Sequence, residues 1–235
     1  MRELIDLHTH TISSGHAYST IKENIDSGSY RGLKYLGISD HAPNMPGGPH
    51  VFHFHNLRIV PKMVNGVITL IGSEVNIIDY DGRVDLSDED LESLDYAIVS
   101  LHMPCIKPGT VEENTNAVIK AMDRPKVKII GHLDDDRYPV DYEKVVLKAK
   151  EKNILLELNN SSLKPNGFRK GALENDTKML KLCMEHNVKI IFGSDAHICY
   201  DVANFENCKK LVEDLNFPVE LIVNYNEEDI KEIFF

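Results

Sequence analysis

Seven short apolar segments, distributed along the whole chain, constrain the fold more than any other feature of this sequence. They are rich in Ile, Val and Leu, and they lie at residues 3–7, 35–39, 68–73, 96–101, 127–131, 154–158 and 189–193. Short apolar runs of this kind are typical of parallel strands that are buried on both faces. Amphipathic segments separate them, so the sequence predicts an α/β fold in which the strands form a closed or nearly closed barrel.

Local patterns indicate where several of the helices begin. Thr110 with Glu113 matches the capping-box pattern and predicts a helix toward Met122, and Asp141 can cap the following helix. Further apolar stripes at helical spacing begin near Asp176, Phe205 and Asn226.

Two regions are less regular. Gly28 and Ser29 weaken the helix expected between the first two strands, because glycine in a helix interior costs about 1 kcal/mol relative to alanine. Residues 42–67 are rich in Pro, Gly and His, and they predict a long loop that covers the mouth of the barrel.

A residue able to bind a metal follows almost every predicted strand. Residues i and i+2 of a strand point the same way, so His8 and His10 can present two imidazoles to one point. In a parallel barrel the carboxyl ends of the strands meet at one rim, where the active site lies. The candidate metal ligands at this rim are His8, His10, His16, His41, Glu74, His102, His132, Asp195 and His197.

Each of these residues taken alone has an ordinary structural explanation. A single histidine at a strand end is usually a loop or core residue, and Glu74 or Asp195 could cap a following turn. Nine such groups on one rim would be costly to desolvate without partners, and divalent cations remove that cost. They exceed the four ligands of one tetrahedral site and predict two or three metal ions. Three divalent ions with two carboxylates carry a charge of about +4, which attracts an anion such as phosphate.

Composition narrows the class of protein further. The chain has 235 residues, enough for one large domain, and its net charge of −11 disfavours binding to nucleic acid. No apolar run reaches the roughly 18 residues of a membrane span, and no signal peptide is evident. Four cysteines without Cys-x-x-Cys spacing suit reduced thiols. We therefore expect a cytoplasmic protein that does not bind membranes. The sequence leaves open whether the chain forms a homo-oligomer.

The order of these motifs resembles the PHP family, named for polymerase and histidinol phosphatase domains. The sequences DLHTH at residues 6–10, SDH at 39–41, GSE at 72–74 and GSDAH at 193–197, with strand ends at His102 and His132, match the family's motifs in order. Residues 15–20 and 158–162 are similar to the bacterial YcdX-type phosphatases of this family. The resemblance covers essentially the whole chain and implies a single PHP domain, residues 1–235, with a distorted seven-stranded (β/α) barrel.

The resemblance also implies how the ligands divide among three divalent ions. One ion would use His8, His10, Glu74 and Asp195; a second would share Glu74 with His102 and His132; a third would use His16, His41 and His197. Histidine-rich ligation favours Zn²⁺, and mixed histidine and carboxylate sites also accept Mn²⁺ or Fe²⁺.

These observations predict a metal-dependent phosphoesterase, specifically a phosphatase that hydrolyses small phosphorylated metabolites through a metal-activated hydroxide at a trinuclear site. Glu74, Asp195 and His197 are the predicted catalytic residues, and Asp195 or His197 could also relay a proton. Arg169, after the sixth strand, is the predicted phosphate clamp, with a solvated loop residue as the alternative. His53 would either contact substrate or support a metal ligand.

Three alternatives remain. An amidohydrolase-type hydrolase also opens with His-x-His, but it usually carries a bridging lysine where this chain has Glu74, His102 and His132. A nuclease or phosphodiesterase acting on nucleic acid is disfavoured by the negative charge. A metal sensor or inactive accessory domain is disfavoured by the complete ligand set. One segment departs from the YcdX-type pattern: LDDDR at residues 133–137 replaces a loop containing Pro-Gly. The resemblance therefore does not identify the substrate of this chain.

Overall fold

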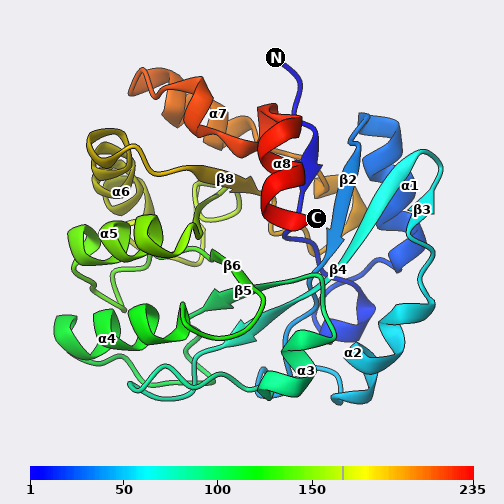
Figure 1. Cartoon of the computed structure of the whole chain (residues 1–235), viewed down its shortest axis with the longest axis horizontal. Coiled ribbons are helices and arrows are strands. Elements are labelled where there is room, and N and C mark those ends of the chain that lie inside the picture. The colour runs from blue at the N-terminus through cyan, green and yellow to red at the C-terminus, as the bar shows by residue number, and fades with distance from the viewer. Residues whose placement is uncertain (166) are drawn as a thin grey trace.

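The computed structural model describes residues 1–165 and 167–235, and its centre is a parallel sheet that curls into a nearly closed barrel (Figure 1). Neighbouring strands follow the order β1-β2-β4-β5-β6-β7-β8, and all of these pairs are parallel. The strands are β1 (Ile5–Asp6), β2 (Tyr35–Ile38), β4 (Val67–Asn76), β5 (Tyr96–Ser100), β6 (Val127–Ile130), β7 (Leu155–Asn159) and β8 (Ile190–Gly193). The predicted seven-stranded α/β barrel is confirmed.

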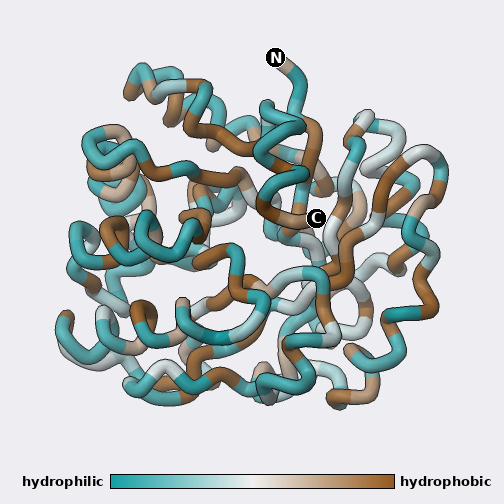
Figure 2. Tube along the Cα trace, in the orientation of Figure 1, coloured by the Kyte–Doolittle hydropathy of each residue, from teal (hydrophilic) through white to brown (hydrophobic). Residues whose placement is uncertain are grey.

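Most of the helices lie outside the barrel. Figure 1 shows α4, α5 and α6 stacked beside one another along one side, and Figure 2 shows apolar strands inside a largely hydrophilic outer layer. The helices are α1 (Ile21–Arg31), α2 (Phe52–Asn56), α3 (Asp88–Glu92), α4 (Val111–Ala121), α5 (Tyr142–Lys152), α6 (Ala172–His186), α7 (Glu206–Asp214) and α8 (Glu227–Phe234). None of them, in the part of the chain described, is long and apolar enough to cross a membrane.

The predicted caps of α4 and α5 are present, while α1 and α6 differ from expectation. Thr110 forms the capping box of α4, and Asp141 caps α5. Helix α1 is complete through the glycine at position 28, which is buried, because packing on the sheet and a capping box at Thr20 outweigh the low propensity. Helix α6 begins four residues before Asp176, which lies buried inside it.

The region between β2 and β4 is more ordered than the predicted long loop. Residues 42–67 contain α2, a 3-10 turn at Leu57–Ile59 and a short strand, β3 (Met63–Val64). Strand β3 pairs antiparallel with the first residues of β4, so it extends the sheet outside the barrel. Backbone groups of this segment therefore find partners that the sequence pattern did not reveal.

Two different sets of contacts join β1 to β8 and bring the barrel close to closure. At the carboxyl rim, the backbone N–H of His10 donates to the carbonyl of Ala196 at 2.8 Å. Near the opposite end, the Asn224 amide donates to the carbonyls of Ile5 at 2.9 Å and Phe192 at 3.1 Å. The Asn224 oxygen also accepts the Phe192 N–H at 2.7 Å. One side chain thus replaces part of a strand pairing.

The inside of the barrel is filled by large side chains rather than left hollow. The buried Tyr96 crosses the interior and donates its hydroxyl to the carbonyl of Leu7 at 2.5 Å. A Cβ at Gly37 or Gly72 would lie 2.1 or 2.4 Å from Tyr96 atoms, so only glycine fits at these two positions. Helix α8 adds Ile230, Ile233 and Phe234 to this inner core. Because apolar side chains fill the interior, the polar cluster lies at the carboxyl rim of the barrel.

Candidate metal centre

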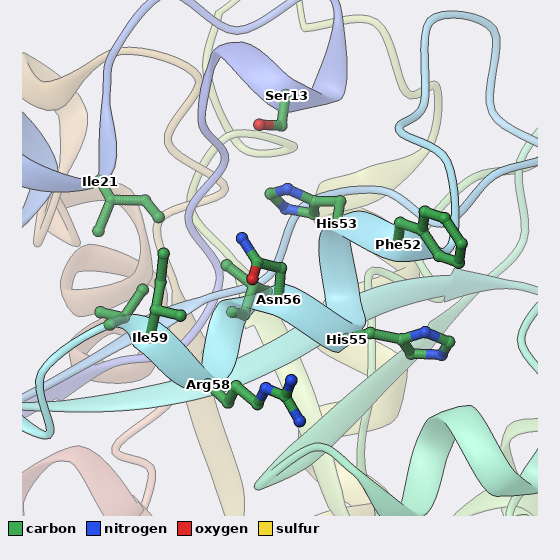
Figure 3. A pocket seen from close by; sticks show the side chains of 10 residues that line it. Ser13, Ile21, Phe52, His53, His55, Asn56, Arg58 and Ile59 are labelled. Carbon is green, nitrogen blue, oxygen red and sulfur yellow. The ribbon is translucent and has the colours of Figure 1, made fainter.

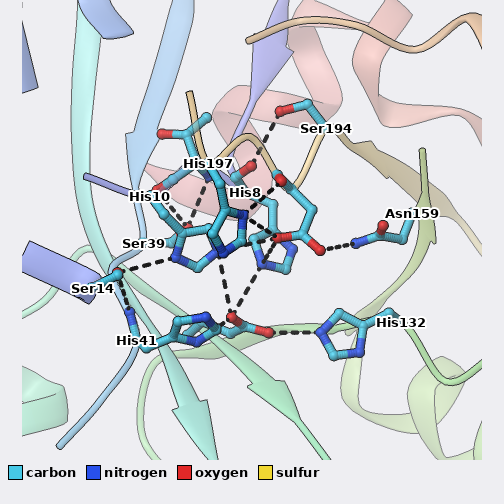
Figure 4. Close-up of polar contacts among 12 residues, drawn as sticks. His8, His10, Ser14, Ser39, His41, His132, Asn159, Ser194 and His197 are labelled. Carbon is cyan, nitrogen blue, oxygen red and sulfur yellow. Dashed lines mark hydrogen bonds and ion pairs between the residues drawn. The ribbon is translucent and has the colours of Figure 1, made fainter. Parts of the chain in front are cut away.

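The Glu74 carboxylate, on β4, is the centre of the polar cluster at the carboxyl rim. Figure 4 shows His8, His10, His41, His132 and His197 converging in this region from the ends of several strands. Glu74 Oε1 lies 3.2 Å from His102 Nε2 and 2.8 Å from His132 Nε2. Glu74 Oε2 lies 2.7 Å from the Nδ1 atom of His41, and 3.4 and 3.5 Å from the Nε2 atoms of His8 and His10. The two carboxylate oxygens therefore face two different groups of imidazoles.

Asp195 supplies the second carboxylate of the cluster. Its Oδ1 lies 3.2 Å from His10 Nε2 and 3.5 Å from His8 Nε2. The backbone of Asp195 has a φ of 53°, a left-handed conformation that few residues other than glycine adopt. Such strain is found where a structure holds a side chain in a required position.

Three histidines form the outer edge of the cluster. The ring of His16 lies 4.9 Å from the ring of His41 and 4.8 Å from that of His197, centre to centre. His197 also lies 4.3 Å from the ring of His10. His16 is exposed and His41 is buried, so this edge opens toward solvent.

Residues that the sequence analysis did not single out orient these histidines. Glu157, on β7, accepts a hydrogen bond from His8 Nδ1 at 2.6 Å and from the His132 backbone N–H at 2.9 Å. Asn76 Oδ1 accepts from His102 Nδ1 at 2.6 Å. These contacts direct the Nε2 atoms toward Glu74.

Glu157 could have been found from the sequence, because a charged residue inside the apolar run 154–158 needs a partner. A Cβ at Gly193 would lie 1.8 Å from Glu157 Oε1, so the glycine of the GSDAH motif makes room for this carboxylate.

The protonation of the cluster suits cation binding. Burial would raise the pKa of Glu74, but the neighbouring His102, His41 and His8 outweigh it and hold this pKa well below its ordinary value. Burial lowers the pKa of His102 to about 4. Burial also lowers the pKa of His10, with further lowering from His41 and His197. Glu74 is thus ionised and these imidazoles offer lone pairs at neutral pH.

The pKa of His8 shifts in the opposite direction to those of His10 and His102. Burial would lower the pKa of His8, but the carboxylates of Glu157, Glu74 and Asp195 raise it well above its ordinary value. A cation bound by His8 must therefore replace a proton, which makes its affinity depend on pH.

The donor set fits divalent metal ions. The Nε2 atoms of His8 and His10 are buried without a hydrogen-bond partner among the described residues, and such atoms are costly unless a ligand satisfies them. Ligand atoms gather within 4.8 Å of one another in four overlapping groups: His10, His41 and His197; His8, His132 and Asp195; His8, His10 and Glu74; and His41, Glu74 and His102.

A cavity of about 280 Å³ lies against part of this cluster. Its lining includes the candidate ligands His16, His41, His102, Asp195 and His197, together with Arg169. Arg169 donates to Ser162 Oγ at 2.9 Å, and its two terminal nitrogens lie 3.3 Å from Asp195 Oδ2. The structure therefore brings the predicted phosphate clamp to the metal-ligand cluster.

A larger hollow, of about 700 Å³, lies beside α2 and contains none of the candidate ligands (Figure 3). The predicted substrate-binding residue His53 lines this hollow. Its Nε2 atom is 3.1 Å from Asp40 Oδ2, and Asp40 Oδ1 accepts the Ser14 hydroxyl at 2.7 Å. Since Ser14 Oγ is 3.3 Å from His10 Nδ1, hydrogen bonds connect His53 to the cluster.

The barrel and its rim of imidazoles and carboxylates define a metal-dependent hydrolase fold, and similarity to known proteins identifies the family. The PHP domain family model matches residues 6–215. A probable phosphatase of Clostridium novyi (strain NT) is 47% identical over 230 residues, covering 98% of this chain and 93% of the relative. A probable phosphatase of Acetivibrio thermocellus is 43% identical over 232 residues, covering 99% and 95%. The chain belongs to the PHP family, and the predicted enzyme class is confirmed.

Solved structures share the fold at low sequence identity. Histidinol phosphate phosphatase from Lactococcus lactis, in complex with zinc, L-histidinol and phosphate, has a TM-score of 0.64 at 13% identity and covers 93% of this chain and 95% of that chain. A chain of archaeal ribonuclease P, solved with mature tRNA, has a TM-score of 0.56 at 16% identity and covers 97% and 87%. These similarities support the barrel architecture.

Proposed function

We propose that this chain hydrolyses phosphate monoesters of small metabolites at a trinuclear metal centre. The observation that carries the proposal is the placement of Glu74, whose two oxygens face separate groups of imidazoles. When bound, divalent ions supply Lewis acidity and a hydroxide nucleophile at neutral pH. In the net reaction water adds to phosphorus, the P–O ester bond breaks, and the alcohol leaves with a proton.

The metal ligands are proposed to divide as the family resemblance implied. The first set is His8, His10, Glu74 and Asp195; the second is Glu74, His102 and His132; the third is His16, His41 and His197. Zinc is the favoured ion because imidazole dominates the donor set, and the zinc and phosphate bound to the Lactococcus lactis enzyme support the same choice. Mn²⁺ and Fe²⁺ are the alternatives.

Other residues of the chain bind substrate and handle protons in this proposal. Arg169 holds a phosphate oxygen pair, since its guanidinium already reaches the cluster and a planar fork suits phosphate. Asp195 or His197 moves a proton at the rim. For His53 the contact with Asp40 favours support of the cluster over direct contact with substrate.

Elemental analysis and a substrate screen test this function together. After saturation with Zn²⁺ or Mn²⁺ and removal of excess ion, we expect three ions per chain; a single ion would refute the trinuclear centre. The loaded protein should hydrolyse sugar, nucleotide or amino-alcohol monophosphates. Cleavage of diesters or single-stranded DNA without monoester hydrolysis would favour the nuclease alternative, and hydrolysis of amides alone would favour the amidohydrolase alternative.

A further inference from the structure

The segment that departs from the YcdX-type pattern, residues 133–137, supplies part of the wall of the cavity at the candidate metal centre. Asp135 and Arg137 line this cavity, and so does Tyr138 directly after the segment. Arg137 Nε donates to the two Asp135 oxygens at 2.9 and 2.8 Å, and the Arg137 backbone N–H donates to Asp135 Oδ1 at 3.0 Å. Arg137 is thereby fixed in place, and an adjacent carboxylate balances its charge.

Two apolar side chains complete this part of the wall. The Cζ atom of Arg137 lies 4.2 Å from the centre of the Phe168 ring, a cation–π arrangement. Phe168 is nevertheless 79% exposed, and Met103, which lines the same cavity, is 44% exposed. Large apolar side chains left open to solvent at a cavity are typical of binding sites. We call Met103, Arg137 and Phe168 the ring wall.

Several polar groups beside the ring wall already have partners. The Tyr138 hydroxyl donates to the carbonyl of Ile106 at 2.5 Å, and Arg137 Nε is held by Asp135. Hydroxyl groups placed against the Phe168 ring and the Met103 side chain would lose water without gaining hydrogen-bond partners from these apolar groups, which is costly. An apolar ring has no such hydrogen bonds to lose.

The size of the cavity limits what can lie against this wall. Its volume of about 280 Å³ is below the roughly 300–1,000 Å³ of pockets that take drug-sized ligands. The inner part, beside the candidate metal ligands and Arg169, is where phosphate would bind. The remaining space therefore suits one small group next to the phosphate.

We propose that the ring wall selects phosphate monoesters whose alcohol carries a single flat, uncharged ring over those whose alcohol is polyhydroxylated. This specificity rests on the proposed phosphatase function. Because Arg137 is paired with Asp135, the wall offers flat faces for stacking rather than a free charge for a second anionic group.

Esters with chemically similar leaving groups test the proposal without confusing binding with reactivity. We would compare kcat/KM of the zinc-loaded protein for 2-phenylethyl phosphate and 2-hydroxyethyl phosphate, which both release primary alcohols. Burial of the ring should favour the first by on the order of 10-fold. The corresponding phosphonates, which cannot be hydrolysed, measure binding alone by calorimetry and should show a similar preference.

A pair of exposed phenylalanines provides the variant and its matched control. Phe168→Ala should lower kcat/KM for the phenylethyl ester by roughly 3- to 10-fold and weaken binding of the phenylethyl phosphonate by a similar factor. Hydrolysis of the hydroxyethyl ester and binding of the hydroxyethyl phosphonate should not change. Phe52→Ala also removes a largely exposed ring, 71% exposed, but from the separate hollow beside α2, so both preferences should persist.

The two readouts separate this proposal from the proposed function. Equal hydrolysis of both esters together with equal binding of both phosphonates would overturn the ring wall and leave the phosphatase intact. Phe168-dependent preference for the phenylethyl phosphonate without hydrolysis of any monoester would support the ring wall and overturn the phosphatase. Failure to bind either phosphonate or to hydrolyse either ester would overturn both.

Discussion

Glu74→Gln is the perturbation that most directly tests the shared position of this carboxylate. The side chain is fully buried, and its oxygens lie 2.7 to 3.5 Å from the nitrogens of His8, His10, His41, His102 and His132. The amide keeps the shape of the side chain but removes the negative charge. At about 4 Å and an effective dielectric constant of 20, two unit charges interact by about 4 kcal/mol, and a divalent ion and one carboxylate by about 8 kcal/mol. Loss of even half of this attraction should weaken the binding of each neighbouring metal ion by on the order of 10³-fold.

The variant should fold, because the apolar core inside and outside the barrel does not depend on this charge. Circular dichroism and the melting temperature of the chelated protein should therefore stay close to wild type. Equilibrium dialysis against buffered Zn²⁺ should show fewer ions per chain, and phosphate release should be abolished. Glu112→Gln, which removes one carboxylate from the exposed first turn of α4, is the matched control and should change neither metal content nor turnover.

A measured kcat above about a tenth of wild type, which is about 1.4 kcal/mol of barrier, with a full complement of metal would falsify the shared role of Glu74. Loss of secondary structure in the chelated variant would instead contradict the statement that folding of the apolar core does not depend on the charge of Glu74.

Three further predictions follow from the same geometry. Arg169→Ala should raise KM and lower kcat/KM by roughly 10- to 150-fold with metal content unchanged, and Arg169→Lys should recover only part of the lost kcat/KM. Unchanged steady-state kinetics in Arg169→Ala would show that Arg169 is a solvated loop residue. Glu157→Gln should weaken zinc binding by roughly 10- to 100-fold, measured by competition with a chelating dye, and undiminished affinity would refute its orientation of His8. Chelation should lower the melting temperature by on the order of 5–10 °C relative to protein at 100 times the metal Kd, and an identical melting curve would show that no metal stabilises the fold.

The order of strands and the main helix boundaries could be predicted because they depend on local patterns. Caps such as Thr110 and Asp141 act within one turn of their own helix. Helix α1 was underestimated because propensity is a weak local term that burial against the sheet overrides. The start of α6 was placed too late because its first turn has no side-chain cap and its N-cap is Gly171.

The contacts that bring the barrel close to closure could not be predicted from the sequence. The Asn224 side chain bonds to Ile5 and Phe192, which are 219 and 32 residues away along the chain. Nothing in the local pattern around Asn224 indicates that it replaces strand pairing. The same limit applies to the exclusion of side chains at Gly37 and Gly72, which depends on Tyr96 from another strand.

The sequence by itself determined which residue types stand at the ends of the strands, and the parallel barrel brings those ends to one rim. That is why the candidate ligands can be named from the sequence. Only the tertiary structure decided how they are oriented: Glu157 holds His8 across 149 residues, and Phe168 meets Arg137 on the cavity wall. The physical reason is that strand periodicity fixes a side chain's direction locally, whereas a hydrogen bond or a stacked ring requires partners from distant segments.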